Sequence, residues 1–320
     1  MYDLIIGGAG LFGATLANYA KQQGKKVLVI ERGPIGGMCA GGNYSKYGIH
    51  VFHTSNRWLW EYVNGLTHFK PVHYSPLALY NGEYYSFPVN LLTLKQLGID
   101  TLPMNKVGRN YEEIMLNMVG TEIYIKFFYH YTRKMWGREP SELPISLAKR
   151  VPIRLDYNTS YYTDTYIGVP EQGYDALFES LLDGVEVVQD DFMKCHYKYD
   201  CKKVFTGSID ELHGWKYGPL EYRGMRFTVS EIESKAMATN YTDWRSAVRK
   251  IDYSYLWDGP VIIETPDEGQ YYPVPWGREL YEKYAALPTD VICAGRLGSY
   301  RYLNMNEVME QAIELFWEIC

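Results

Sequence analysis

The hydrophobic pattern is most regular at the start of the chain. An apolar run over residues 4–6 is typical of a buried strand, and apolar positions then recur at helical spacing until Gly24. A second apolar run over residues 27–30 predicts another strand, which ends in Glu31. This opening segment is therefore predicted to form a strand–helix–strand unit.

Glycines occupy the turn between the first strand and the helix, in the string Gly8-Ala9-Gly10-Leu11-Phe12-Gly13. Gly8 permits a tight turn, Gly10 lets the backbone approach a pyrophosphate, and Gly13 lets the helix pack closely on the strand. The helix N-terminus offers free N–H groups to phosphates, and Glu31 can accept hydrogen bonds from a ribose hydroxyl. Glycine-rich turns occur in other α/β proteins, but the order and length of these parts favour a dinucleotide site.

A second pair of glycines, Gly36-Gly37, follows the acidic residue. Flavoproteins of this fold often place another close approach of the backbone at that point. By this analogy the pair favours FAD over NAD.

The rest of the chain alternates between strand and helix patterns. Apolar and polar residues alternate over positions 77–89 on both sides of Asn81-Gly82, and this pattern predicts a hairpin with a two-residue turn. Helix-period apolar positions dominate residues 90–150, and a polar, aromatic stretch with a loop signal at 158–160 follows. The later predictions are a helix and a strand over 177–188, a strand over 203–207, several strands over 220–275, a strand over 291–296, and a last helix that starts at Asn304 with Glu307 as its capping partner.

These patterns predict an α/β protein with α+β inserts, built on a discontinuous Rossmann-like FAD-binding domain. The parts of that domain are residues 1–70, 172–215 and 285–320. A small helical domain is expected over residues 90–150, and an antiparallel sheet domain over residues 71–89, 151–171 and 216–284.

Composition excludes several classes of protein. A net charge of −6 without a basic run argues against a nucleic-acid partner. Five scattered cysteines without a CxxC pair indicate reduced thiols and no metal site. No signal peptide precedes the first strand, and glycines interrupt the early apolar stretch, so we expect a soluble, cytoplasmic protein with no membrane partner.

Tyrosine is abundant, with 31 tyrosines against 11 phenylalanines. One interpretation is a half-buried sheet surface, where amphipathic rings suit β structure. The other is a polar cleft in which phenol hydroxyls bind an anion. Arginine and tyrosine recur together in short polar strings, and this combination suits a diphosphate. The motifs of serine hydrolases, zinc proteases and P-loop enzymes are missing from the sequence.

Short strings along the whole chain follow one order of motifs. After the glycine-rich start they are Tyr47–Thr54, Ser75–Tyr80, Tyr131–Gly137, Val151–Arg154, Asp164–Pro170, Gly218–Arg223, Tyr271–Val274 and Gly295–Tyr302. In this order they resemble the UDP-galactopyranose mutase family, flavoenzymes that interconvert the pyranose and furanose forms of UDP-galactose.

The resemblance implies a site for FAD. The residues that it assigns to the cofactor are Gly8, Gly10, Phe12, Gly13, Glu31, Arg32, Gly37, Arg296 and Met305. His53 lies in the string that, in the family, passes the reacting face of the flavin. A satisfied core histidine is the simpler interpretation of His53.

The resemblance also implies a site for a UDP-sugar. It assigns nucleotide and substrate binding to the helical domain over residues 90–150, and it implies a mobile loop near 154–166. Phe127 and Tyr131 match the residues that sandwich the uracil ring, and Trp136 matches one that lines the sugar pocket. Arg154 matches the arginine of a loop that closes over the diphosphate, and Arg249 a second arginine near the reacting atoms, with one residue fewer in the spacing. The other substrate residues implied are Tyr166, Arg223, Tyr271, Tyr272 and Tyr302, although Trp136 and Tyr302 could also be packing residues.

The chemistry implied by the resemblance is an isomerisation without net redox change. The anomeric carbon of UDP-galactopyranose is attacked by N5 of reduced FAD, UDP leaves, the sugar ring opens and recloses, and UDP returns. The residues expected to act in catalysis are Arg154, Arg249, His53, Trp136 and Asn304. A reductant such as NAD(P)H or a reductase is expected as a partner, and a homodimer is possible.

Asn304 stands where familiar members of the family have an aspartate. It either caps the last helix or indicates another sugar, such as an arabinopyranose, an N-acetylated sugar or a deoxy sugar. The chain is also shorter than familiar bacterial members, for example between Leu97 and Met118. An oxidoreductase related to flavin amine oxidases and an inactive nucleotide-binding protein are the rival functions.

Overall fold

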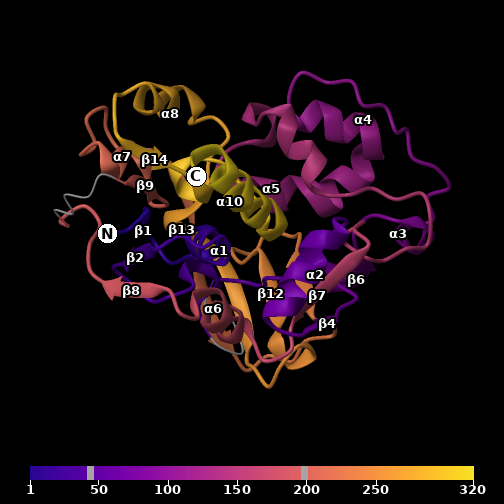
Figure 1. The fold of residues 1–320 in the computed structure, drawn as a ribbon. Helices are drawn as coiled ribbons and strands as arrows, with labels where there is room; N and C mark the ends of the chain where they lie inside the picture. The colour runs from indigo at the N-terminus through magenta and orange to yellow at the C-terminus, as the bar shows by residue number, and fades with distance from the viewer. Residues whose placement is uncertain (42–46, 196–200) are drawn as a thin grey trace. The chain divides into compact units, whose positions relative to one another are not determined.

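The computed structural model of the chain describes residues 1–41, 47–195 and 201–320, and its ribbon is drawn in Figure 1. The chain forms two compact units, each built from separate segments. The first unit comprises Met1–Pro71, Thr165–Tyr222 and Gln270–Cys320, and the second comprises Val72–Asp164 and Arg223–Gly269.

A five-stranded parallel sheet forms the centre of the first unit, in the strand order β14-β9-β1-β2-β8. Its strands are β1 (Leu4–Gly7), β2 (Val27–Glu31), β8 (Glu186–Gln189), β9 (Lys202–Phe205) and β14 (Val291–Cys293). All of β1 is buried, which is why its sequence is continuously apolar instead of alternating. The predicted strand–helix–strand start is confirmed.

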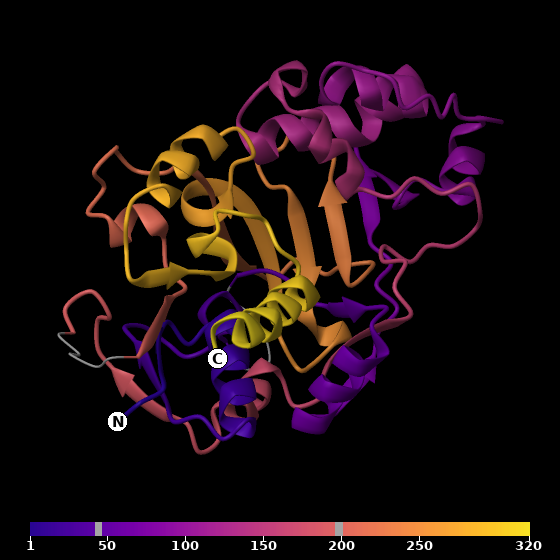
Figure 2. The ribbon, with the colours of Figure 1, turned by 45° about the horizontal axis from the view of Figure 1, so that its top comes forward.

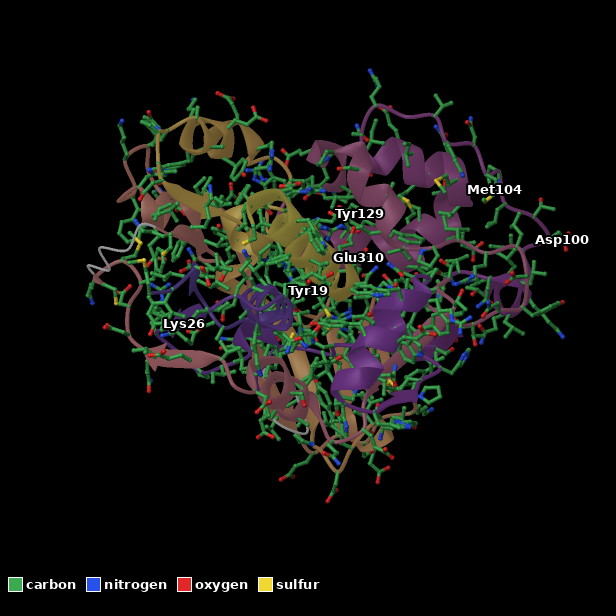
Figure 3. All side chains as sticks on the ribbon, viewed as in Figure 1. Tyr19, Lys26, Asp100, Met104, Tyr129 and Glu310 are labelled. Carbon is green, nitrogen blue, oxygen red and sulfur yellow. The ribbon has the colours of Figure 1, made fainter. Side chains whose placement is uncertain are left out.

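Helices from both ends of the chain pack together on this sheet. Helix α1 (Leu11–Gln22) contacts α6 (Tyr174–Leu182) and α10 (Met305–Ile319), and α10 lies beside α1 in Figures 1 and 2. Tyr19 of α1, labelled in Figure 3, meets the ring of Phe316 edge to face at 5.4 Å. The predicted start of α10 is also confirmed, because the Asn304 N–H donates to the Glu307 carboxylate at 2.7 Å.

A small antiparallel sheet in the first unit has the order β3-β7-β4. Its strands are β3 (Phe52–Thr54), β4 (Phe69–Pro71) and β7 (Tyr166–Pro170), and α2 (Arg57–Leu66) connects the first two. The loop predicted at residues 158–160 is present, but β7 follows it within the same polar, aromatic stretch. The fully buried Val169 shows why this part of the stretch pairs as a strand.

The first unit also contains three short helices, which are α7 (Ile209–Leu212), α8 (Arg278–Ala285) and α9 (Gly295–Gly298).

A six-stranded sheet dominates the second unit, in the order β10-β13-β12-β11-β5-β6. Its strands are β5 (Leu77–Tyr80), β6 (Glu83–Ser86), β10 (Tyr222–Ser230), β11 (Ala238–Tyr241), β12 (Arg249–Asp252) and β13 (Val261–Pro273). The predicted hairpin is confirmed, and its turn residues Asn81 (φ 49°) and Gly82 (φ 90°) have the positive φ that a tight hairpin turn requires. The sheet is not purely antiparallel, because β11 and β5 run parallel.

The helical segment belongs to this second unit. It contains α3 (Leu91–Leu97), α4 (Tyr111–Ile123), a π-helix over Tyr124–Tyr129 and α5 (His130–Trp136), so the predicted helical content is confirmed. The π-helix contacts β5, which joins the helices and the sheet in one unit. The division into three domains stays a prediction. In the part of the chain that the structure describes, no helix is long and apolar enough to cross a membrane.

Asn90 joins α3 to the hairpin, and its side chain is fully buried. Its carbonyl oxygen accepts from the N–H groups of Leu92 at 2.8 Å and Thr93 at 3.1 Å, and its amide donates to Ser86 Oγ at 2.8 Å. We expect Asn90→Ala to lower the free energy of unfolding by about 2 kcal/mol in urea titrations, because the helix loses its cap. Leu92→Ala, at an exposed position of the same helix, is the control and should change it by at most about 0.5 kcal/mol. Equal losses in both variants would contradict the capping role.

Candidate functional site

A cavity of about 610 Å³ lies in the first unit at the carboxyl ends of β1, β2 and β9. This is where ligands bind in open parallel sheets. Backbone forms much of the wall, because the lining includes the glycines Gly7, Gly8, Gly10, Gly33, Gly36, Gly37, Gly41, Gly207 and Gly295.

The turn after β1 has the geometry that the glycine pattern predicts. Gly8 has a φ of 106°, and a Cβ on it would lie 2.1 Å from Thr206 Oγ1. A Cβ on Gly13 would lie 2.0 Å from the Gly8 carbonyl oxygen, so only glycine allows α1 to approach the turn this closely. A Cβ on Gly10 would meet nothing within 4 Å, and a ligand therefore has room over that residue.

The second glycine pair lies directly against the first glycine turn. The Gly36 N–H donates to the Ala9 carbonyl at 3.0 Å, and Gly10 and Gly36 form a parallel bridge. A Cβ on Gly37 would lie 3.3 Å from the Gly10 Cα. Two backbone segments thus run side by side along one wall of the cavity.

Arg32 and Gly33, the two residues that follow β2, each donate hydrogen bonds to an acidic side chain. The Glu31 carboxylate accepts from the N–H groups of Ala9 at 2.6 Å and Gly33 at 2.7 Å, which leaves further lone pairs facing the cavity that it lines. Arg32 forms a two-bond ion pair with Glu211 of α7, and this hydrogen bonding raises the pKa of Arg32. Sequence reasoning missed Glu211, because it lies 179 positions from Arg32 and in no recognisable motif.

Arg296 lies on the cavity wall among three aromatic rings. Its guanidinium carbon is 4.3 Å from the ring centroid of Tyr302, 5.2 Å from that of Tyr272 and 5.5 Å from that of Tyr271. Nη1 donates to Met38 Sδ at 3.8 Å, whereas Nε and Nη2 are buried without a hydrogen-bond partner among the described residues. Buried donors of this kind are costly unless a ligand accepts from them.

The cavity fits a dinucleotide cofactor. The N-cap of helix α1 is Gly10, which has no side chain to cap the helix, and the first turn contains no acidic residue. The first N–H groups of the helix are therefore open to phosphate oxygens. The unpaired Nε and Nη2 of Arg296 can donate hydrogen bonds to an electron-rich acceptor of the ligand. Phe12 and Met305 supply apolar walls.

The other candidate residues of the first unit lie outside the cavity lining. His53, which is 8% exposed, and Tyr166 sit on the paired strands β3 and β7. The Tyr166 ring stacks on Trp60 at 5.4 Å. Asn304 is the exposed N-cap residue of α10, directly before Met305.

In the second unit, Arg154 is bound to its own loop. Its Nη2 donates to the carbonyls of Ser160 at 2.7 Å and Tyr162 at 3.2 Å. Its Nε is buried and has no hydrogen-bond partner among the residues described. The Nη2 atom of Arg154 therefore stabilises the loop, and the Nε–H group can still donate to another acceptor.

Arg249 is paired across the sheet with a carboxylate that sequence reasoning missed. Its Nε donates to Glu264 Oε2 at 2.7 Å, and the two residues face each other on β12 and β13. The Glu264 side chain is 1% exposed. Only the strand pairing brings it to Arg249, and no local pattern indicates this.

The helical segment contains three more candidates. Trp136 is buried at the end of α5, with the guanidinium carbon of Arg150 5.7 Å from its ring centroid. Tyr131 is half-buried on the same helix. Phe127 is 1% exposed and meets Tyr85 at 5.3 Å, so its ring lies in the core of the unit. Its expected contact with a base stays a prediction.

Arg223 of β10 contacts the end of α5. It donates to the carbonyls of Met135 at 2.9 Å and Lys134 at 3.0 Å, and burial lowers the pKa of its guanidinium. The residue expected to bind substrate is thus engaged with backbone carbonyls. Among residues 1–41, 47–195 and 201–320, no group of three or more His, Cys, Asp or Glu residues is arranged to hold a metal ion.

Substitution at Gly13 tests the glycine turn. We expect Gly13→Ala to weaken FAD binding by about tenfold or more, because the new methyl group displaces α1 from the Gly8 carbonyl at a cost of ~1–3 kcal/mol. Fluorescence titration of the apoprotein with FAD measures the affinity. Gly65→Ala, at an exposed helical position with open space around it, is the control and should bind FAD normally. Normal binding by Gly13→Ala would show that the turn tolerates a side chain.

Cys39 lines the cavity, and burial raises its pKa to about 12, although the charge of Arg296 acts in the opposite direction. At pH 8 only about one Cys39 thiol in ten thousand is then a thiolate, which is the reactive form. Burial raises the pKa of Cys320 as well, but that cysteine is exposed to the reagent. We therefore expect iodoacetamide at pH 8 to modify Cys320 much faster than Cys39, as followed by peptide mass spectrometry. Equal alkylation of the two cysteines would contradict this burial.

Comparison with known proteins agrees with this geometry. The family model of UDP-galactopyranose mutase matches residues 126–302, and that of an NAD(P)-binding Rossmann-like domain matches residues 6–66. The solved structure of a reduced UDP-galactopyranose mutase has a TM-score of 0.76 and covers 99% of this chain and 95% of its own. At 14% identity it shows a shared fold.

Curated relatives extend over nearly the whole chain. The dTDP-fucopyranose mutase of Escherichia coli is 30% identical and covers 98% of this chain and 97% of its own length. The probable UDP-galactopyranose mutase of Klebsiella pneumoniae is 29% identical and covers 98% of this chain and 93% of its own. The chain therefore belongs to the UDP-galactopyranose mutase family of isomerases, and a flavin is the cofactor that this family and the Rossmann-like domain indicate.

Proposed function

We propose that this protein interconverts the pyranose and furanose forms of a nucleotide sugar with FAD in its reduced state, and that UDP-galactopyranose is the first substrate to test. The observation that carries the proposal is the glycine-walled cavity with Arg296 on its wall, in a chain of this family. An isomerase of this kind needs a bound flavin and groups that hold a diphosphate, and candidates for both are present.

The first unit would hold the cofactor. Gly8, Gly10 and the N-terminus of α1 would face the pyrophosphate, Glu31 the ribose, and Arg296 the flavin end. When reduced, FAD supplies a nucleophilic N5 for the anomeric carbon, so the sugar ring can isomerise without net oxidation. NAD(P)H or a reductase would supply the electrons that keep the flavin reduced.

Arginines and tyrosines would bind the nucleotide diphosphate. Arg154 has a buried Nε without an acceptor, and Arg249 is held in place by Glu264. Their positive charge would stabilise the negative charge that develops on the departing diphosphate. Tyr302 and its neighbours would add hydroxyl donors, while Tyr131 and Trp136 would contact base and sugar.

A deoxy sugar on dTDP is the second candidate substrate. The E. coli relative, at 30% identity, is named a dTDP-fucopyranose mutase, and the K. pneumoniae relative, at 29%, a probable UDP-galactopyranose mutase. Identity alone therefore does not favour one sugar. Asn304, in place of the aspartate of familiar members, is consistent with a changed sugar, although its backbone also caps α10.

An anaerobic assay tests both candidates. The dithionite-reduced protein is incubated in parallel with UDP-galactopyranose, dTDP-fucopyranose and UDP-arabinopyranose, and ring isomers are separated by HPLC beside an oxidised control. We expect conversion of one of them in the reduced sample only. Conversion in the oxidised sample, or oxygen consumption in proportion to product, would contradict the reduced-flavin mutase and point to an oxidase.

Arg154→Ala tests the assigned role of the loop arginine. We expect kcat/KM to fall by about 10²–10³-fold, because the diphosphate loses a positioned cation, while FAD content stays unchanged. Arg109→Ala is the matched control in the same unit. Arg109 is 89% exposed and paired only on the surface with Glu113, so its loss should leave turnover intact. A wild-type rate in Arg154→Ala would remove that arginine from the mechanism.

A further inference from the structure

Lys134 is a half-buried lysine that links two elements of the second unit. It lies on α5, and its ammonium donates to the backbone carbonyls of Asp243 at 3.1 Å and Arg245 at 3.0 Å. Both carbonyls belong to the turn between β11 and β12. The lysine therefore ties the helix to this turn through two hydrogen bonds from a charged group, which are stronger than bonds from a neutral donor.

The turn that Lys134 contacts is itself held by an ion pair between the partly exposed Arg245 and the buried Asp243. Arg245 donates from Nε and Nη2 to the two carboxylate oxygens of Asp243, each at 2.7 Å, and the Asp243 side chain is 2% exposed. Burial acts to raise the pKa of Asp243, but the hydrogen bonds and charge of Arg245 outweigh it and hold that pKa below its usual value. The carbonyl acceptors for Lys134 are thus presented in a fixed arrangement.

The same point of α5 is also held from β10. Arg223 donates to the carbonyl of Lys134 itself and to that of Met135, and cations at a helix C-terminus are favourable. The backbone carbonyl of Lys134 therefore accepts a hydrogen bond from β10, and its side chain donates hydrogen bonds to the turn between β11 and β12. Such a connection fixes the position of the helix.

Burial lowers the pKa of Lys134 to about 8, so placing an ammonium here has a cost that leucine or methionine would not have. A residue that only filled space would be apolar. A lysine at this position is better explained by its two hydrogen bonds, which align α5 with the turn between β11 and β12.

We propose that Lys134 is a positioning residue that fixes α5 against the turn leading into Arg249. The proposal rests on the proposed function, which assigns Tyr131 and Trp136 of α5 to the base and sugar, and Arg249 to the diphosphate. Tyr131 precedes Lys134 by one helical turn, and Arg249 begins the strand that follows the clamped turn. Because one ligand must reach both elements, a small shift between them misplaces it.

The test measures binding of a nucleoside diphosphate without turnover. UDP and dTDP are titrated calorimetrically into the wild-type protein and into Lys134→Met, and KM and kcat are measured with the sugar that the wild type converts. We expect Lys134→Met to raise the Kd of the bound diphosphate by about tenfold or more and to raise KM by a similar factor. FAD content should remain that of the wild type, since the cofactor cavity is in the other unit.

Three further variants separate positioning from general damage. Lys134→Arg keeps a charged donor and should recover most of the affinity, while Lys134→Gln gives the same comparison if the methionine variant does not fold. Arg133→Met is the matched control, because the neighbouring Arg133 is 56% exposed and pairs with Glu139 on the surface. It should bind the diphosphate with the wild-type Kd.

The outcomes distinguish a failure of the positioning role from a failure of the proposed function. A folded Lys134→Met protein with the wild-type Kd would overturn the positioning role and leave the proposed function intact. If the wild-type protein binds neither UDP nor dTDP, the proposed function itself fails and the inference fails with it.

Discussion

Contact between backbones, without side chains in between, is the constraint on which the first unit depends. The Gly8 carbonyl lies where a Cβ of Gly13 would be, and the Gly36 amide bonds to the Ala9 carbonyl. These two approaches bring the end of β1, the start of α1 and the segment after β2 into one wall. Because that wall is made of backbone, it presents N–H groups and open space instead of side chains. Glu31 then closes the turn by accepting from two of its amides.

The second unit is organised by buried charge. Each candidate cation is already bound within the protein: Arg249 to Glu264, Arg223 to helix carbonyls, Arg154 to loop carbonyls and Lys134 to turn carbonyls. Burying a cation is costly unless hydrogen bonds or an ion pair compensate it. These contacts provide that compensation for most of the donors, although Arg154 Nε has no acceptor among the described residues. They also fix the directions of the side chains. In the proposed function, the same contacts would hold these side chains ready for the diphosphate.

Local sequence patterns predicted local structure well. The apolar runs and glycines near the N-terminus predicted β1, α1 and β2, Asn81-Gly82 predicted the hairpin turn, and Asn304 with Glu307 predicted the start of α10. In each case one short segment contains all the interacting groups. The order of motifs along the chain also indicated the family, which the relatives confirm.

Partners that are distant in sequence were not predictable in the same way. Periodicity reports that a face is buried but does not say what covers it. Glu211 and Glu264 reach their arginines only through strand pairing and helix placement, and the parallel pair of β11 and β5 joins segments far apart in the chain. Strand β7 was hidden in a polar, aromatic stretch because its pairing with β3 and β4 outweighs composition.

The packing of α10 on α1 limits how far the protein can fold while it is being synthesised. Helix α1 leaves the ribosome long before Met305–Ile319, and β14, at the edge of the parallel sheet, is also made late. At about 5–20 residues per second, the apolar face of α1 remains without its final neighbour for a time on the order of tens of seconds. This face of α1 must therefore stay partly exposed until α10 is made, and the cavity, whose lining includes Met305 and Val308 of α10, is completed only then.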